Sequence, residues 1–236
     1  MNKWFWTFFI LFLIFHNSGE SVYGLDPQEP LDYYQHYAWS VNEGLPQNSV
    51  RAIAQTRDGY LWLGTQEGLV RFNGFDFELY DQANTKELKT SHITSLYEDS
   101  TGCLWIGTWG GGVCCLRNGH FTTHTIQNGL VNNIVRSIEG DNRGNIWIGT
   151  WGGGLSKFRD NQFIHYTQKD GLTSQYIFTV FSDPDGSLWI GTWGGGLNHF
   201  KNGKFTCYTT DHGLDNNGVM SITKDHNGIL WIGTEG

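Results

Sequence analysis

The chain has 236 residues and a formal net charge of -8 at pH 7, and its 15 Lys and Arg form no cluster. Proteins that bind the phosphate backbone of nucleic acids usually carry a basic stripe, so this pattern argues against a nucleic-acid partner. The composition, with 32 Gly against 4 Pro and 15% aromatic residues, favours many short strands joined by tight turns.

The amino terminus has the pattern of a signal peptide. Lys3 supplies a positive start, and residues 4–15 form an apolar run that only Thr7 interrupts. This run is shorter than the ~20 apolar residues that a membrane-spanning helix needs. We therefore predict export with cleavage after Gly24. An uncleaved amino-terminal anchor is the alternative, and either outcome places the rest of the chain outside the cytoplasm.

One motif, Leu-Trp-Ile-Gly-Thr or a close variant, recurs five times after this segment. The intervals between its tryptophans are 43, 42, 42 and 42 residues, and ~40–45 residues is the length of one four-stranded propeller blade. We expect these tryptophans to have a structural role in every repeat; they are Trp62, Trp105, Trp147, Trp189 and Trp231.

Residues 129–168 show how one repeat divides into strands. Short apolar or alternating segments predict four strands, at residues 133–138, 145–150, 155–158 and 163–167. The turns of other repeats contain Asn-Gly pairs, which indicate hairpins because both central residues adopt positive φ. These pairs are Asn73-Gly74, Asn118-Gly119 and Asn202-Gly203.

The second strand of each repeat indicates how the repeats pack. Its Trp points to one face and its Leu and Ile to the other, so both faces are apolar and both need cover. Stacked sheets cover each other, and the Gly after each Ile lets the next sheet approach closely. The predicted fold class is all-β, with β-propeller blades of four antiparallel strands in an incomplete ring. A linear β-solenoid is the alternative.

The expected domains are a signal peptide at residues 1–24 and a truncated β-propeller sensor domain at residues 25–236. An outer strand at residues 33–38 matches the fourth-strand pattern and would complete the last blade of a ring. The chain stops within its fifth repeat, which we interpret as a truncation that leaves bare sheet edges. The expected blades are at about 45–80, 88–125, 130–167 and 172–209, with a partial blade at 214–236.

The cysteines fall at different positions of the repeat, so they do not form a repeated scaffold. Adjacent cysteines in a strand point to opposite faces and would be strained by a bridge between them. Although exported proteins often contain disulfides, we expect four free thiols: Cys103, Cys114, Cys115 and Cys207.

The repeat Asp-x-x-Gly-x-Leu-Trp-Ile-Gly-Thr-x-x-Gly-Gly-Leu, followed by Phe-x-x-Tyr and Gly-Leu, resembles the two-component regulator propeller repeat over roughly residues 33–236. Residues 44–50 and 55–72 look like the first blade of the ligand-sensing region of this family's receptors. The resemblance implies a periplasmic, extracytoplasmic sensor at the inner membrane. In such receptors an immunoglobulin-like domain, a membrane helix and a cytoplasmic histidine kinase or diguanylate cyclase follow. The sequence contains none of these parts, so we assign no kinase activity to it.

Three further tryptophans lie in the turns between second and third strands, on the face that also carries the Gly-Leu loops. Exposed aromatic side chains on one rim suit stacking against sugar rings. The alternative, favoured by their repetition, is that each packs over its own Gly-Gly-Gly turn or the next blade. These candidate ligand-binding residues are Trp109, Trp151 and Trp193.

Polar side chains in the loops of the same face are candidate ligand donors, with a role as loop fillers as the alternative. They are Asn132, Asn133, Gln175, Asn216 and Asn217.

The Asp-rich turns, such as residues 141–144, do not have the carboxylates or the distal Glu of a calcium loop. We expect each Asp to accept hydrogen bonds from its own turn. No histidine spacing repeats as a metal pair, and no catalytic triad can be argued, so we expect no metal, cofactor or catalytic residue.

The function that we expect is the ligand-sensing propeller of a membrane-bound signal-transduction receptor. The expected partners are a small-molecule or glycan-fragment ligand and the remainder of the receptor, with a homodimer as a candidate assembly. The alternatives are an exported propeller enzyme, such as a polysaccharide lyase or quinoprotein, and a non-catalytic adhesion or scaffold propeller. An enzyme would be expected to break the repeat with unique charged residues on one face, and the sequence shows no such cluster.

Overall fold

The computed structural model describes Pro30 and residues 37–236. The fold below is that of one compact unit, Trp39–Gly236. The expected signal peptide and residues 33–36 of the expected outer strand lie outside the described residues and stay predictions, while residues 37 and 38, the described end of that expected strand, are not in a strand. Over the described part of the chain, no helix has the length and apolarity to span a membrane.

The unit contains five antiparallel sheets, four of four strands and a last one of two. Each sheet takes its strands in chain order, as the repeat predicts, and short 3-10 helices connect several sheets. The strands are β1 (Ala52–Gln55), β2 (Leu61–Gly64), β3 (Leu69–Phe72), β4 (Phe77–Tyr80), β5 (Ile93–Glu98), β6 (Leu104–Thr108), β7 (Val113–Arg117), β8 (His120–His124), β9 (Val135–Gly140), β10 (Ile146–Thr150), β11 (Gly154–Arg159), β12 (Gln162–Tyr166), β13 (Ile177–Ser182), β14 (Leu188–Thr192), β15 (Leu197–Lys201), β16 (Lys204–Tyr208), β17 (Val219–Lys224) and β18 (Leu230–Thr234). The 3-10 helices are η2 (Val41–Glu43), η3 (Ile126–Asn128), η4 (Gln168–Asp170) and η5 (Thr210–His212).

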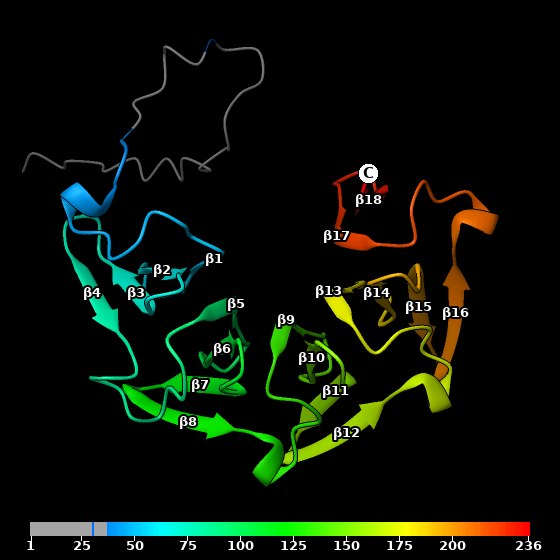
Figure 1. Ribbon diagram of the computed structural model, residues 1–236, viewed down its shortest axis with the longest axis horizontal. Helices are drawn as coiled ribbons and strands as arrows, with labels where there is room; N and C mark the ends of the chain where they lie inside the picture. Colours follow the sequence, from blue (N-terminus) through cyan, green and yellow to red (C-terminus); the bar gives the residue numbers. More distant parts are fainter. Residues whose placement is uncertain (1–29, 31–36) are drawn as a thin grey trace, which may run out of the picture. The chain divides into compact units, whose positions relative to one another are not determined.

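Neighbouring sheets pack through their first strands, which contact one another in the order β1, β5, β9, β13 and β17. The five sheets do not close into a ring (Figure 1). Antiparallel four-stranded sheets that stack in this way are propeller blades and not the coils of a linear solenoid. The all-β propeller prediction is therefore confirmed.

The glycine of the repeated motif allows this close packing. A Cβ added at Gly107 would lie 2.8 Å from Cγ1 of Val135, and one at Gly149 would lie 2.5 Å from Cγ2 of Ile177. Both neighbours belong to the first strand of the next sheet, and real Cβ atoms essentially never come this close to another atom. Any larger side chain at these glycines would push the blades apart.

The strand tryptophans fill the space between blades. Trp105 is 4% exposed and lies edge-on to Phe158 of the next sheet, with ring centroids 5.3 Å apart. Trp147 is 5% exposed and meets Phe200 of its next sheet at 5.8 Å. Trp231 differs, because its sheet contains only β17 and β18, and its side chain is 59% exposed. Burial of an aromatic side chain stabilises the fold by about 1.5–3 kcal/mol, so complete blades gain most from the motif.

The four strands predicted within residues 129–168 are correct to within two residues, and the largest differences are at the two ends of β9. We predicted a strand from residue 133, whereas β9 begins at Val135. The carbonyl oxygen of Asn133 instead accepts hydrogen bonds from the backbone N–H groups of Gly110 and Gly112 in the preceding blade. Asn133 therefore belongs to a connection between blades and not to the ladder of its own sheet.

All three Asn-Gly hairpin predictions are confirmed, because the strands before and after each pair are antiparallel neighbours. Asn118 and Asn202 have φ of 50° and 51°, and each is followed by a glycine with positive φ. The expectation of positive φ at both central residues is wrong at Asn73, which does not adopt it. Its side-chain Oδ1 accepts hydrogen bonds from the backbone N–H groups of Phe75 and Asp76, so Asn73 opens a four-residue loop between β3 and β4.

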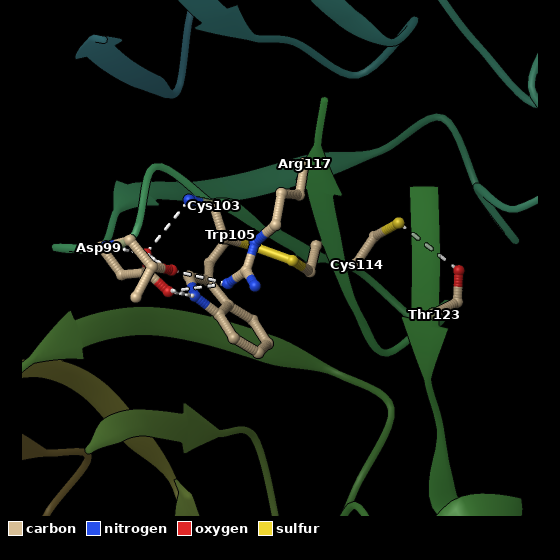
Figure 2. The surroundings of a disulfide bond; sticks show 8 residues. Asp99, Cys103, Trp105, Cys114, Arg117 and Thr123 are labelled. Atoms are coloured by element: carbon tan, nitrogen blue, oxygen red, sulfur yellow. Dashed lines mark hydrogen bonds and ion pairs between the residues drawn. A yellow bond between two sulfur atoms is a disulfide. The ribbon is translucent and has the colours of Figure 1, made fainter. Parts of the chain in front are cut away.

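The expectation of four free thiols is wrong, because Cys103 and Cys115 form a disulfide (Figure 2). Cys115 pairs directly with Trp105 across β6 and β7, and Cys103 precedes Trp105 by two residues on the same face. The two cysteines are thus diagonal neighbours with Cα atoms 5.9 Å apart, a normal separation for a disulfide. Cys114 and Cys207 are free thiols, as expected.

Candidate functional site

The turn tryptophans lie at one end of the sheets, which we call the tryptophan face: the end that carries Trp109, Trp151 and Trp193. In each sheet this end also carries the loop that leads into the first strand, because the strands are antiparallel and consecutive. The backbone N–H of Trp151 donates to the carbonyl of Ile134, and that of Trp193 donates to the carbonyl of Tyr176. The turns and leading loops therefore form one hydrogen-bonded surface.

The loops of this face also join neighbouring blades. The N–H groups of Gly152 and Gly154 both donate to the carbonyl oxygen of Gln175 at 3.0 Å, so the turn of the third sheet is bonded to the loop of the fourth. The same pattern joins Gly110 and Gly112 to Asn133. The positions of the turn tryptophans are consequently determined by the packing of two blades.

The predicted polar donors all lie on this face and bond to their own loops. Asn133 and Asn217 each cap a 3-10 helix, accepting hydrogen bonds at 2.9 Å from the N–H groups of Ile126 and Thr210. Asn132 and Asn216 accept from the backbone two residues further on, and Gln175 donates to Gln168. These bonds give the five side chains a structural role, while their role as ligand donors remains a prediction.

Trp151 and Trp193 meet in one aromatic cluster. Their ring centroids are 6.2 Å apart, and Phe178 lies 5.2 Å from Trp151 and 5.6 Å from Trp193. Tyr176 lies 5.0 Å from Trp151. Trp193 and Tyr176 remain 44% and 45% exposed, so the cluster presents aromatic surface to solvent. Tyr176 and Phe178 were not singled out from the sequence.

Arg136 connects Trp109 to this cluster. Its guanidinium carbon lies 5.8 Å from the ring centroid of Trp109 and 5.3 Å from that of Phe178, both within cation–π range. Trp109 is 39% exposed and also stacks on His92 at 5.9 Å. All three predicted tryptophans thus belong to one continuous group of rings, with a cation between its two parts.

A β-bulge places Arg136 outside the ladder of its sheet. Thr150 pairs with Val135 and Gly149 pairs with Ser137, so Arg136 is an extra residue in β9. Bulges direct a side chain away from the regular pleat and are common beside functional sites. The shift of one residue is not visible in the spacing of the repeat, and sequence reasoning missed Arg136 for this reason.

Arg136 lies in positively charged surroundings, which is unusual in an acidic protein. Its Nε atom is buried and has no hydrogen-bond partner among the described residues. Burial lowers the pKa of Arg136, and the charge of Arg51 lowers it further. Burial also lowers the pKa of His92, with added repulsion from Arg51 and Arg136, so His92 is neutral at pH 7. The guanidinium group of Arg136 keeps its charge at this pH.

A shallow hollow of about 470 Å³ lies on the same face beside the turn of the second sheet. Its volume falls in the range of small-molecule sites, ~300–1,000 Å³. Polar groups from two neighbouring sheets line it, including Lys89, Gly111, Gln127, Asn128 and Asn133.

The opposite end of the sheets holds the Asp-rich turns. Asp141 accepts hydrogen bonds from the backbone of Arg143 and Asn145, which confirms the prediction that this side chain serves its own turn. Its second oxygen accepts a bond from the indole of Trp147 at 2.9 Å, a contact that we did not predict. Among residues 37–236, no three side chains are grouped as a metal site would require.

Comparisons with known proteins agree with this architecture. Five segments, residues 44–67, 87–110, 129–152, 171–194 and 213–236, match the two component regulator propeller and together span just over half of the chain. No curated protein matches.

Several solved structures share the fold. The extracellular domain of BT4673 from B. thetaiotaomicron, assigned to a one component or hybrid two component system, is 22% identical with a TM-score of 0.70. The match covers 82% of this chain but only 29% of that one. The extracellular domain of BT3049 from the same organism, assigned to a hybrid two component system, is 24% identical with a TM-score of 0.52. The match covers 80% of this chain and 32% of that one.

An enzyme also shares the fold. Virginiamycin B lyase from Staphylococcus aureus is 16% identical with a TM-score of 0.59, and the match covers 78% of this chain and 62% of the lyase. At these identities the likeness shows the propeller fold alone. Each of the five matched segments contains the first two strands of one sheet, and together they show the family directly. The chain belongs to the two component regulator propeller family.

Proposed function

We propose that this chain is the extracytoplasmic, ligand-sensing propeller of a membrane-bound signal-transduction receptor of the histidine kinase or diguanylate cyclase type. Family membership and the fold likeness to extracellular domains of two component systems support the proposal. The chain spans about a third or less of those domains, so the remainder of the receptor is a proposed partner.

We further propose that the tryptophan face binds a glycan fragment and that this chain has no catalytic activity of its own. The observation that carries this proposal is the exposed aromatic cluster of Trp193 and Tyr176, supported from below by Phe178 and Trp151. An apolar face of a sugar ring stacks well on such π-surfaces. In an otherwise repetitive protein these rings are concentrated on the third and fourth sheets, as a single site would require.

The experiment that tests the proposal is calorimetric titration of the purified chain with a panel of neutral and acidic oligosaccharides. A ligand from the panel is expected to bind, and Trp193→Ala is expected to weaken its binding by about 1 kcal/mol or more. The matched control is Phe75→Ala, which removes an 89% exposed ring from the loop between β3 and β4 at the opposite end.

The control variant should bind as the unmodified chain does. Equal losses in both variants, or no binding across the panel, would contradict the proposal. Chromatography of the oligosaccharides after incubation distinguishes a sensor from a lyase, because a sensor returns its ligand unchanged.

A further inference from the structure

We infer that Arg136 is the centre of an anion-binding subsite on the tryptophan face, with Arg51 as a second cation, and that the ligand is an anionic saccharide carrying a carboxylate or sulfate group. The inference rests on the proposed saccharide-binding function and names the chemical class of its ligand.

The first argument is the position of the guanidinium group. It lies within cation–π range of two rings from different blades, Trp109 of the second and Phe178 of the fourth, at 5.8 and 5.3 Å. Two such contacts restrict the motion of a guanidinium group while they leave its N–H donors unsatisfied. A planar fork of donors held in this way is suited to bidentate bonds with a carboxylate or sulfate.

The second argument is the lack of an internal partner. No described side chain forms a hydrogen bond or an ion pair with Arg136 or with Arg51, although the chain contains 23 Asp and Glu. Six other cations of the described residues form ion pairs, for example Lys201 with Asp185 at 2.6 Å. A partly buried cation without a partner is unfavourable for folding. Binding of an external anion would account for the presence of Arg136 at this position.

The third argument is that this position breaks the repeat. Residues eleven positions before each strand tryptophan are equivalent, and in the second to fifth sheets each is the extra residue of a bulge. A structural role would recur with the same side chain, as the motif tryptophan does. Here the backbone feature recurs while the side chain differs between consecutive repeats, and the series is Arg51, Thr94, Arg136, Phe178 and Met220.

The fourth argument joins the cation to the aromatic cluster. Phe178 contacts the Arg136 guanidinium and the rings of both Trp151 and Trp193. A ligand that covers these groups needs an apolar ring face for the aromatics and an anionic substituent for the arginines. Uronic acids and sulfated sugars have both properties, and a neutral sugar has only the first.

Calorimetric titration of the purified chain tests this inference with four saccharide probes. These are an oligogalacturonate, its methyl-esterified form as the neutral match, a sulfated galactan oligosaccharide and its desulfated form as the second neutral match. The variant is Arg136→Met, which removes the charge and keeps an unbranched side chain. The control is Arg143→Met, which makes the same charge change in an exposed turn at the opposite end of the third sheet.

The expected result is that one charged probe binds at least tenfold more tightly than its neutral match, which corresponds to about 1.4 kcal/mol. Arg136→Met should abolish that preference, so that the charged probe and its neutral match bind with about equal affinity. Arg143→Met should keep the preference. Arg51→Gln, at an exposed residue ahead of β1, should weaken binding of the charged probe and provides a second test if Arg136→Met does not fold. The identity of the charged probe that binds shows whether the ligand carries a carboxylate or a sulfate.

Three results would overturn the inference. Equal affinity for charged and neutral probes would mean that the chain binds saccharides without an anion subsite. Unchanged preference in folded Arg136→Met, or in Arg51→Gln where Arg136→Met does not fold, would place the anion elsewhere. Binding of no saccharide at all would remove the proposed function together with the inference.

Discussion

The indole N–H of Trp147 donates a hydrogen bond to Oδ2 of Asp141, six residues earlier in the turn between β9 and β10, at 2.9 Å. The same bond recurs between Trp105 and Asp99 at 2.8 Å, where Figure 2 shows it beside the disulfide. Trp105 and Trp147 therefore tie the packing between blades to a turn at the edge of their own sheets, whereas the indole N–H of Trp62 donates to the hydroxyl of Thr56. Trp189 is an exception, because Asp183 pairs with Lys224 of the next sheet at 2.7 Å.

Removing the acceptor should destabilise the fold. Asp141→Ala leaves the buried indole N–H of Trp147 without a partner and removes two bonds to the turn backbone, so we expect a loss of about 2 kcal/mol or more in the free energy of unfolding. Urea unfolding followed by tryptophan fluorescence measures it. Asp215→Ala is the control, an exposed carboxylate that should change stability by less than about 0.5 kcal/mol.

The same carboxylate should make stability depend on pH in the acid range. Burial raises the pKa of Asp141, but hydrogen bonds from Asn145 and Trp147 outweigh burial and leave the pKa lowered. A lowered folded-state pKa contributes stability above the unfolded value of about 4, and this contribution is lost as the pH falls through the folded-state pKa. Thermal unfolding between pH 2 and pH 6 should show this loss, and Asp141→Asn should show a smaller one.

Glu139 should have the opposite effect near neutrality. Burial in β9 raises its pKa to about 7. The folded chain thus holds a proton that the unfolded chain has lost, and stability falls as the pH rises from about 4.5 to 7. Glu139→Gln removes this penalty, so the variant should be about 1–3 kcal/mol more stable than the unmodified chain at pH 8 and similar to it at pH 4.5. A stability difference that is the same at both pH values would contradict this account.

A methyl group at the contact between blades should be costly. Gly149→Ala places a Cβ 2.5 Å from Cγ2 of Ile177, so we expect a loss of about 1–3 kcal/mol through overpacking. The test is a double-mutant cycle with Ile177→Ala, which removes the clashing atom. The two changes should be less damaging together than the sum of the single changes, and simple additivity would show that the glycine does not act through this contact.

Thiol chemistry should distinguish the two kinds of cysteine. Alkylation of the unfolded chain without reductant should modify two thiols, Cys114 and Cys207, and alkylation after reduction should modify four. Reduction should also lower the free energy of unfolding by about 2–3 kcal/mol, because it releases a short closed loop. Modification of all four thiols before reduction would restore the original expectation of free cysteines.

Features that recur were predictable from the sequence, and features of a single repeat were not. The five Leu-Trp-Ile-Gly-Thr motifs place the second strands of all five sheets because their spacing is the period of the fold. The disulfide required the register between β6 and β7, which puts Cys103 diagonal to Cys115. Arg136 required knowledge of a bulge, which adds a residue without changing the length of the repeat. The turn tryptophans were found, but their contacts through Phe178 depend on three adjacent blades.

The most direct test of the central claim is a crystal structure of the chain with the acidic oligosaccharide that binds it most tightly. The account predicts a sugar ring over Trp193 and Tyr176 with its carboxylate or sulfate bonded to the guanidinium group of Arg136. A saccharide bound away from the tryptophan face, or one with its anionic group turned to solvent, would contradict it.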